Sequence, residues 1–473
     1  MLTSRWLHRK LLLRNCHKLH QRWRCVSNYE KGGTTNVKRL EKITMPTMVD
    51  HLHQTLTLPG NPIKFTDYDC LGFDLDNTIC RYKIGAMIKL EYETLSKFLV
   101  EKKGYPSNHL LRPIEDNLDF MLKGLILDVE NGNLLRIASD GHIIHGSHGT
   151  TELTRQQLLE YYGVPCRWQA TDEFSSNPLF TWNGPFSEKM RTLLDYFDMP
   201  AGLVFARAVD SLDEQNGGPL KVYKIWPDLL DGIQEMFQKE HFQLNKGGYF
   251  KEMKENPHNY IHKCSDSLIN WFKTLRSRNK LLFLITGSNV DFASHTALHS
   301  LGPNWKELFD IIVCFAKKPG FFIYERSFIG LEGFEEVGPV DEKDLVRGGI
   351  YTYGNWTGLC NFLKKHSGAS DPKIIYFGDN LVQDIYTPAV HTPCDTVAIC
   401  EELQAEGVFG HDRTHADELF LISSTWGSYF RHHESRKHTI WHDIIQKHSK
   451  TCIPSLEYVA SKPIDYEYGS IQL

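Results

Sequence analysis

Three short apolar runs in this sequence each end in a polar residue with Asn, Gly or Ser close behind it. The runs cover residues 68–74, 281–286 and 373–379, and they end at Asp74, Thr286 and Asp379. Buried strands of a parallel sheet read as continuous apolar runs, and they deliver side chains to the carboxyl edge of the sheet. The pattern therefore predicts an α/β fold with a Rossmann-like parallel sheet and a ligand site at that edge.

The spacing between these runs predicts how the chain is divided. About 200 residues separate the first two runs, far more than one crossover connection needs. We therefore expect a core formed by residues 66–85 and 270–410, with a large cap inserted over residues 86–269. Residues 411–473 should pack on the core, and residues 1–65 should form a basic, disordered extension and linker.

Local patterns predict several elements of the cap and the core. Asp140-Gly141 stands between two apolar stretches, residues 133–138 and 142–145, which is a strong hairpin signal. Helical patterns cover residues 155–162, 187–197 and 265–276.

Composition narrows the class of protein and its partners. Eleven cysteines without CxxC pairs indicate reduced thiols in an intracellular protein rather than a disulfide framework. Residues 1–29 hold seven basic residues and no acid, so the net charge of −5 for the whole chain leaves −12 for the rest, a poor match to nucleic acid. No run of about 18 apolar residues is present, which argues against a membrane helix. We expect a cytoplasmic protein, with mitochondrial import through the basic start as an alternative to a dispensable extension.

The pattern Asp74-Leu-Asp76-Asn-Thr78 after a buried strand carries the strongest chemical signal. Alternate residues of an extended chain place both carboxylates on one side. Asp74 would attack a phosphate monoester to form an aspartyl-phosphate, while Asp76 acts as general acid and then as general base. The structural alternative is a pair of strand-end aspartates that cap a helix or close a turn.

Two carboxylates need cations before they can approach a phosphate dianion. Asp379 in Gly-Asp-Asn would bind Mg²⁺ together with Asp74, and Asp384 is either a further ligand or a charge at a helix start. A hydroxyl and backbone N–H groups at Thr286 would hold phosphate oxygens. Lys318 would neutralise the phosphate, although most lysines are solvated surface charges.

This ordered set of motifs resembles the haloacid dehalogenase superfamily and, within it, the cytosolic purine 5′-nucleotidase family. The segments that carry the family resemblance are 72–78, 123–128, 132–135, 147–149, 309–322, 376–379 and 426–430, so it spans roughly residues 65–470. It implies a Rossmann-like core with a cap, dependence on Mg²⁺ and hydrolysis of nucleoside 5′-monophosphates. One departure is Gly287, which follows Thr286 where the purine enzymes have Asn, so the substrate is left open.

By position, the resemblance assigns a role to each matching residue. Catalysis falls to Asp74, Asp76 and Lys318, binding of phosphate and substrate to Thr286, Gly287, His148 and Asp210, and metal binding to Asp74, Asp76, Asp379 and Asp384. The family also suggests self-association. The alternatives to a 5′-nucleotidase are a phosphatase for another small phosphate ester and a family member that binds ligands but turns over little.

Overall fold

The largest unit of the chain is a nine-stranded sheet that is mainly parallel. The structure is a computed structural model, and it describes residues 62–432 and 437–470. The predicted extension therefore lies outside the described residues, except for its last four. The strand order is β10-β9-β11-β8-β7-β1-β12-β13-β14. The strands are β1 Cys70–Phe73, β7 Leu281–Ile285, β8 Ile311–Cys314, β9 Phe328–Glu332, β10 Glu335–Val340, β11 Gly349–Tyr353, β12 Ile374–Gly378, β13 Asp395–Ile399 and β14 Thr451–Ile453.

The three apolar runs of the sequence form three neighbouring strands at the centre of this sheet. Strand β1 pairs in parallel with β7 on one side and with β12 on the other, and Cys70 lies opposite both Leu281 and Ile374. All residues of the three strands are buried. The predicted α/β fold with a Rossmann-like parallel sheet is confirmed, and the three strands end at one edge.

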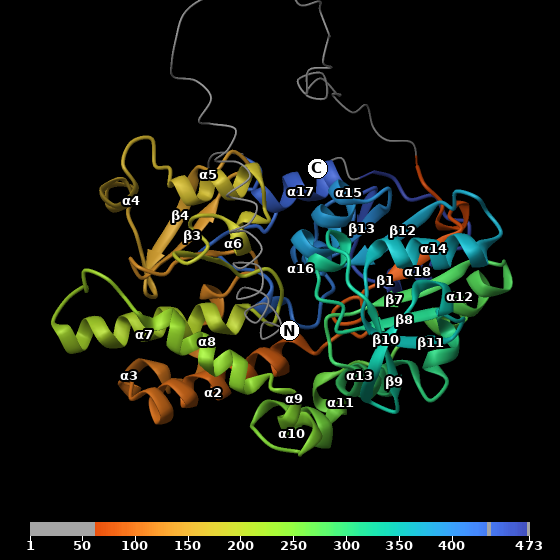
Figure 1. Cartoon of the computed structure of the whole chain (residues 1–473). Helices are drawn as coiled ribbons and strands as arrows, with labels where there is room; N and C mark the ends of the chain where they lie inside the picture. Colours follow the sequence, from red (N-terminus) through yellow and green to blue (C-terminus); the bar gives the residue numbers. More distant parts are fainter. Residues whose placement is uncertain (1–61, 433–436, 471–473) are drawn as a thin grey trace, which may run out of the picture.

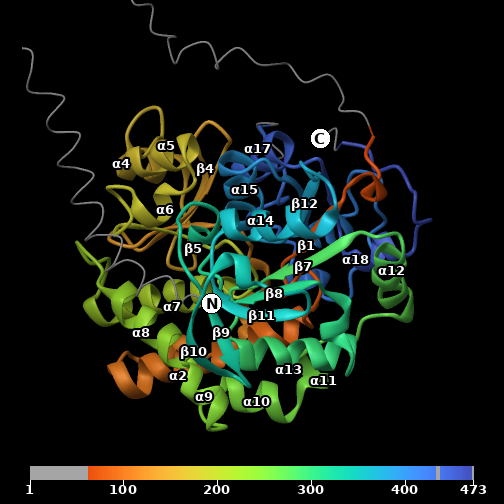
Figure 2. The same cartoon turned by 45° about the vertical axis from the view of Figure 1, so that its right-hand side comes forward.

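Helices cover both faces of the large sheet, as Figures 1 and 2 show. One face packs on α12 Asp266–Ser277, α13 Val290–Leu301 and α18 Leu456–Ala460, and the other on α14 Trp356–Ser367. The helix predicted over residues 265–276 is confirmed as α12. Its first turn is capped by Ser265, whose hydroxyl accepts the Leu268 N–H at 3.1 Å.

A second, antiparallel sheet lies to the left of the main sheet in Figure 1. Its strands are β2 Ile126–Asp128, β3 Asn133–Ile137, β4 Ile143–His148, β5 Thr151–Glu152 and β6 Met190–Thr192, in the order β5-β4-β3-β2-β6. Strands β3 and β4 pair on either side of Asp140-Gly141, so the predicted hairpin is confirmed. The helix predicted over residues 155–162 is α4 Arg155–Tyr162, which begins with a capping box at Thr154.

The prediction of a helix over residues 187–197 is wrong. Met190–Thr192 is the edge strand β6, paired with β2 so that Arg191 lies opposite Leu127. Residues 193–198 then run without helix to the start of α7 at Met199. The apolar residues that suggested a helical stripe instead pack into two different hydrophobic clusters. Pairing with β2 outweighs the local helical pattern, because propensity is a weak prior against tertiary contacts.

Long helices complete the part of the chain between β1 and β7. Helices α2 Ile84–Lys103, α7 Met199–Asn216 and α8 Ile225–Met236 share one hydrophobic cluster. The shorter helices of this part are α3 Ser107–Leu110, α5 Gln169–Ser176, α6 Phe180–Asn183, α9 Lys239–Gln243, α10 Tyr249–Glu255 and α11 Pro257–Tyr260. Three further helices follow β12, and they are α15 Thr387–His391, α16 Glu402–Glu406 and α17 Ile440–His448. Among the described residues, none of the helices is both long and apolar enough to span a bilayer.

Candidate active site

Three buried carboxylates converge at the carboxyl edge of the large sheet. Asp74 follows β1, Asp379 follows β12, and Asp384 lies in the π-helix Leu381–Tyr386. One oxygen of each lies within 4.8 Å of the others, and the three residues are at most 6% exposed. Carboxylate oxygens at this spacing suit a hard divalent cation such as Mg²⁺.

Gly378 allows Asp384 to approach the end of β12. A Cβ at position 378 would lie 2.3 Å from the Asp384 Cβ, a distance that only glycine avoids. The π-helix that follows is capped by Asn380, whose side-chain oxygen accepts the Gln383 N–H at 3.0 Å. The local backbone therefore brings Asp379 and Asp384 to the same point, although they are five positions apart in the sequence.

Lys318 connects two of the three carboxylates. Its Nζ lies 2.8 Å from Asp74 Oδ1 and 2.6 Å from Asp384 Oδ1, and the side chain is almost fully buried. Burial opposes the charged amine, but the charges of Asp384 and Asp74 outweigh it and raise the pKa of Lys318. The lysine therefore stays protonated beside the predicted nucleophile.

Burial raises the pKa values of the three carboxyl groups. The pKa of Asp384 rises to about 7, because burial and the charge of Asp74 outweigh the opposing charge of Lys318. The pKa of Asp379 also rises, first through burial and then through repulsion from Asp74 and Asp384. Burial likewise raises the pKa of Asp74, against the effect of Lys318. A divalent cation at this point would reduce the repulsion among the three carboxylates, which contributes to these raised pKa values.

Asp76 has a different environment from Asp74 although it is only two residues away. Tyr82 Oη donates to its Oδ1 at 2.7 Å, and Ser288 Oγ donates to its Oδ2 at 2.7 Å. Burial and then the charge of Asp74 raise the pKa of Asp76 to about 6, against the effect of these two hydrogen bonds. A pKa near neutrality suits a group that gives up and takes back a proton.

Thr286 and Gly287, the two residues of the core predicted to bind phosphate, differ in their access to the site. Gly287 lines the cavity above the carboxylates. Thr286 is fully buried, and its hydroxyl donates to Asp76 Oδ2 at 3.4 Å while it accepts the Ser288 N–H at 3.1 Å. Thr286 thus contacts the predicted acid/base, and Gly287 is the residue of the pair that faces the ligand space.

A cavity of about 30 Å³ lies over this group of residues. It is lined by Asp74, Asp76, Asn77, Asp195, Phe197, Gly287, Lys318, Asp379, Asn380, Gln383 and Asp384. Every predicted catalytic residue therefore faces one cavity. The side chain of Asp76 is not part of the group that could hold a metal ion, which consists of Asp74, Asp379 and Asp384, although Asp76 was also predicted as a ligand.

His148 and Asp210, the predicted substrate residues of the cap, lie together in another cavity of about 730 Å³. Asp210 accepts the Thr150 N–H at 3.0 Å, and His148 contacts Asn133 and Asp213 at 2.8 and 3.0 Å. The two cavities share no lining residue, so the structure brings these residues to each other and not to the carboxylates. Their role in substrate binding stays a prediction.

Several residues of the site were not predicted from the sequence. Ser288 directly follows Gly287, and Asn380 directly follows Asp379. Polar side chains beside residues that were already predicted could have indicated that these two residues belong to the site. Tyr82 and Asp195 carry no such signal. Their place in the site depends on the turn after Thr78 and on how the cap folds over the sheet.

Comparisons with known proteins show which family matches most of this chain. Residues 60–460 match a family model described as the 5′ nucleotidase family. The chain is 34% identical over 423 residues to 5′-nucleotidase domain-containing protein 1 of Bos taurus and 35% identical over 426 residues to that of Homo sapiens, in both cases over 85% of this chain and 91% of the relative. It is also 25% identical over 405 residues to 5′-nucleotidase domain-containing protein 2 of Homo sapiens, over 84% of this chain and 71% of the relative.

The matched range contains the whole of the candidate site, from Asp74 to Asp384. It also contains the inserted cap that separates the first two central strands. This chain belongs to the 5′-nucleotidase family.

Proposed function

We propose that this chain is a Mg²⁺-dependent phosphatase of the haloacid dehalogenase type, which hydrolyses a nucleoside 5′-monophosphate through an aspartyl-phosphate at Asp74. Membership of the 5′-nucleotidase family supports a hydrolase whose substrate is a small molecule, a phosphate monoester of a nucleotide. The observation that carries the mechanism is Lys318, which contacts Asp74 at 2.8 Å in a buried cavity that three further carboxylates of the core line.

The residues present fit Mg²⁺. Asp74, Asp379 and Asp384 offer oxygen ligands within 4.8 Å of one another, and Asp384 Oδ2 has no hydrogen-bond partner among the described residues. Mg²⁺ favours a few carboxylates together with water and phosphate oxygens. When bound there, the ion would neutralise charge on the phosphate and orient it for attack.

In the first half of the proposed reaction, an Asp74 oxygen attacks phosphorus. The bond from phosphorus to the ester oxygen breaks, and Asp76 gives its proton to the departing alcohol oxygen. Lys318 compensates the negative charge of both Asp74 and the phosphate, which otherwise repel each other. The pKa of about 6 for Asp76 leaves a useful fraction of this carboxyl protonated near neutral pH.

In the second half, Asp76 removes a proton from water, and the water oxygen attacks the phosphorus of the aspartyl-phosphate. The bond between phosphorus and the Asp74 oxygen breaks, which frees inorganic phosphate and restores the Asp74 carboxylate. Tyr82 and Ser288 hold Asp76 in one position through both steps. Splitting one displacement into two lowers the barrier of each.

Phosphate release from a panel of monophosphates tests this proposal. The purified chain is incubated with Mg²⁺ and purine and pyrimidine nucleoside 5′-monophosphates, sugar phosphates and p-nitrophenyl phosphate. We expect turnover of at least one nucleotide, more than 10²-fold above the Asp74→Asn variant, which lacks the nucleophile. Turnover of sugar phosphates alone would favour a phosphatase for other small esters, and no turnover of any ester would reject a phosphatase.

A further inference from the structure

Two residues of the catalytic cavity come from the cap, and the other nine come from the core. The two are Asp195 and Phe197, in the non-helical segment between β6 and α7. The remaining lining residues follow β1, β7, β8 and β12 at the carboxyl edge of the sheet. Residues 195–197 therefore form the cap wall of the cavity.

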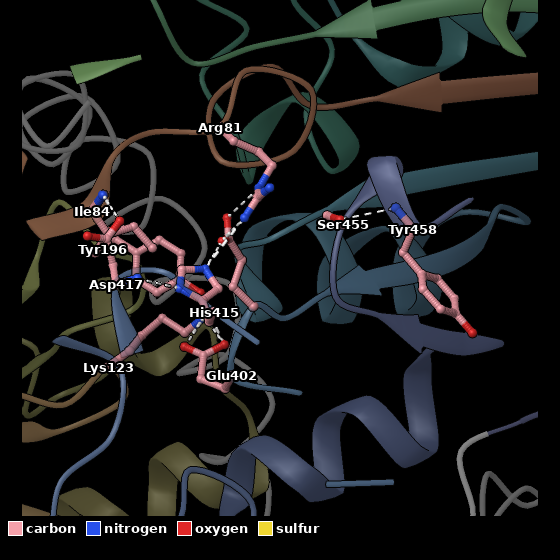
Figure 3. A network of polar contacts seen from close by, with 10 residues as sticks. Arg81, Ile84, Lys123, Tyr196, Glu402, His415, Asp417, Ser455 and Tyr458 are labelled. Atoms are coloured by element: carbon pink, nitrogen blue, oxygen red, sulfur yellow. Dashed lines mark hydrogen bonds and ion pairs between the residues drawn. The ribbon is translucent and has the colours of Figure 1, made fainter. Parts of the chain in front are cut away.

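The middle residue of this cap wall is fixed to a buried ion pair. Tyr196 Oη donates to Glu402 Oε2 at 3.1 Å, and the same glutamate pairs with Lys123 at 2.8 Å, as Figure 3 shows. Lys123 Nζ also lies 4.3 Å from the centre of the Tyr196 ring. All three side chains are almost fully buried, so this anchor fixes the backbone on both sides of Tyr196.

The last residue of the cap wall is tied to the support of Asp76. The Phe197 ring meets the Tyr82 ring edge to face, with the ring centres 5.1 Å apart. Tyr82 in turn donates to Asp76. The position of the cap wall is thus set from two sides, which leaves Asp195 aimed at the cavity.

Asp195 adds a fifth carboxylate to Asp74, Asp76, Asp379 and Asp384 around the cavity, and it is buried at 6% exposure. Its negative charge adds to the effect of burial and raises the pKa values of both Asp74 and Asp379. Asn380 Nδ2 donates to its Oδ2 at 3.2 Å, and the Asp198 N–H donates to its Oδ1 at 3.2 Å. A carboxylate at this place repels the phosphate dianion, so the substrate group that lies against it has to be a hydrogen-bond donor.

The lining of the cavity determines which part of a substrate meets Asp195. A volume of about 30 Å³ holds no more than a few small groups, whereas pockets for larger ligands measure roughly 300 Å³ or more. The core supplies Lys318 and the three carboxylates that are proposed to hold the metal ion, and these groups would face the phosphate. The alcohol part of the ester then has to lie against the cap wall.

We infer that Asp195 is a specificity-determining residue, which accepts a hydrogen bond from a hydroxyl group on the sugar of the substrate. The inference rests on the proposed function and extends it, because it predicts a preference for hydroxylated esters over esters that lack the hydroxyl. A site built to bind a hydroxyl rejects the analogue without it much more strongly than an apolar pocket rejects a missing methylene.

A matched pair of nucleotides tests the inference. Adenosine 5′-monophosphate and its 2′,3′-dideoxy analogue have the same base and phosphate and differ only in the two sugar hydroxyls. We expect the wild-type chain to favour the first by about 10- to 100-fold in kcat/KM, the range of a hydrogen bond to a charged group. Asp195→Ala should bring the ratio close to one, mainly through loss on the hydroxylated substrate, and Asp195→Asn should give an intermediate ratio.

Asp198→Ala is the matched control. Asp198 is buried three residues further along, and its Oδ2 accepts the Leu194 N–H at 2.8 Å, but it does not line the catalytic cavity. This variant should keep the wild-type ratio. If Asp195 only holds the cap in place, Asp195→Ala lowers kcat/KM for both nucleotides by the same factor, and that result would overturn the inference.

Binding separates failure of the inference from failure of the proposed function. If the wild-type chain hydrolyses neither nucleotide, the proposed function fails for this substrate. Calorimetric Kd values for both nucleotides are then measured with Asp74→Asn and with the double variant Asp74→Asn/Asp195→Ala. A preference for the hydroxylated nucleotide that is lost in the double variant supports the role of Asp195. Equal Kd values with Asp74→Asn, or no binding of either nucleotide, reject it.

Discussion

Tyr82 Oη donates a 2.7 Å hydrogen bond to Asp76 Oδ1, six residues earlier in the chain. Both groups are buried, and Ser288 donates to the other oxygen of the same carboxylate. The proposed acid/base is therefore held from two elements, the turn after β1 and the loop after β7. This arrangement makes the pKa of Asp76 depend on a residue that does not line the catalytic cavity.

Tyr82→Phe should move the pH dependence of the enzyme. The hydrogen bond from Tyr82 stabilises the Asp76 anion and lowers its pKa, so its loss raises that pKa above about 6. The limb of the pH–rate profile that Asp76 governs should shift to higher pH, with a loss in kcat of about 10-fold or more. The profile of kcat against pH checks this. In Tyr92→Phe, which removes another buried tyrosine hydroxyl that donates to Leu110 O at 2.6 Å, the profile should stay in place.

Removing the metal should abolish phosphate release, and Asp379→Asn should weaken metal dependence. One of the three carboxylates that offer a ligand within 4.8 Å is then neutral, so the Mg²⁺ concentration for half-maximal rate should rise by at least about 10-fold. Excess chelator should stop turnover, and Ca²⁺ should not restore it, because its larger and variable coordination sphere does not hold the near-octahedral geometry.

Asp371→Asn is the control for this metal titration. Asp371 is exposed and precedes the same strand, β12, at its other end. Its Mg²⁺ dependence should equal that of the wild-type chain. Full turnover of the wild-type chain in excess chelator would contradict a metal-dependent mechanism.

Much of the core site could be predicted from the sequence because its residues follow strands directly. Asp74, Thr286 and Asp379 each end an apolar run, and the parallel pairing of β1, β7 and β12 brings the three ends together. Lys318 lies four positions after the end of β8, and it was predicted from its order among the motifs rather than from a strand pattern. In a parallel sheet, adjacency at the carboxyl edge follows from the strand pattern alone.

The cap residues could not be predicted in this way. Asp195 lies within residues 187–197, whose apolar spacing suggested a helix, and it reaches the cavity only because Met190–Thr192 pairs with β2 instead. His148 and Asp210 were predicted from resemblance, and their distance from the carboxylates depends on how the cap sits on the core. The positions of Asp195, His148 and Asp210 depend on long-range packing, which local sequence patterns do not predict.

Acid stability should depend on Glu401, which is buried beside Arg81 and His415. The ion pair between Arg81 Nη2 and Glu401 Oε2 measures 2.6 Å, and Figure 3 shows Arg81 and His415 side by side. Burial opposes the anion, but Arg81 and His415 outweigh it and lower the pKa of Glu401 from 4.5 to about 2. A depressed carboxyl pKa stabilises the fold above pH of about 4.5, and this contribution is lost as pH falls through about 2.

Glu401→Gln should therefore lower the free energy of unfolding at pH 7 by an amount on the order of 3 kcal/mol. Its stability should also fall less steeply than that of the wild-type chain between pH 5 and pH 2, a range set by linkage to the shifted pKa. Urea unfolding at several pH values measures both effects. Glu418→Gln, at the more exposed pair with Arg413, should change stability by no more than about 0.5 kcal/mol. Equal acid sensitivity of Glu401→Gln and the wild-type chain would contradict this role.

In the proposed mechanism, Asp74 carries the phosphoryl group during turnover. The Asp76→Asn variant keeps the nucleophile and Lys318 but lacks the base that activates water. It is incubated with Mg²⁺ and p-nitrophenyl phosphate, whose good leaving group needs little help from an acid, then quenched in acid and digested for peptide mass spectrometry. We predict a phosphorylated peptide that contains residues 70–80, with the modification on Asp74 and its loss after treatment with hydroxylamine. An active wild-type enzyme whose Asp74→Asn variant keeps substantial turnover, with no phosphorylated Asp74 in Asp76→Asn, would contradict the mechanism.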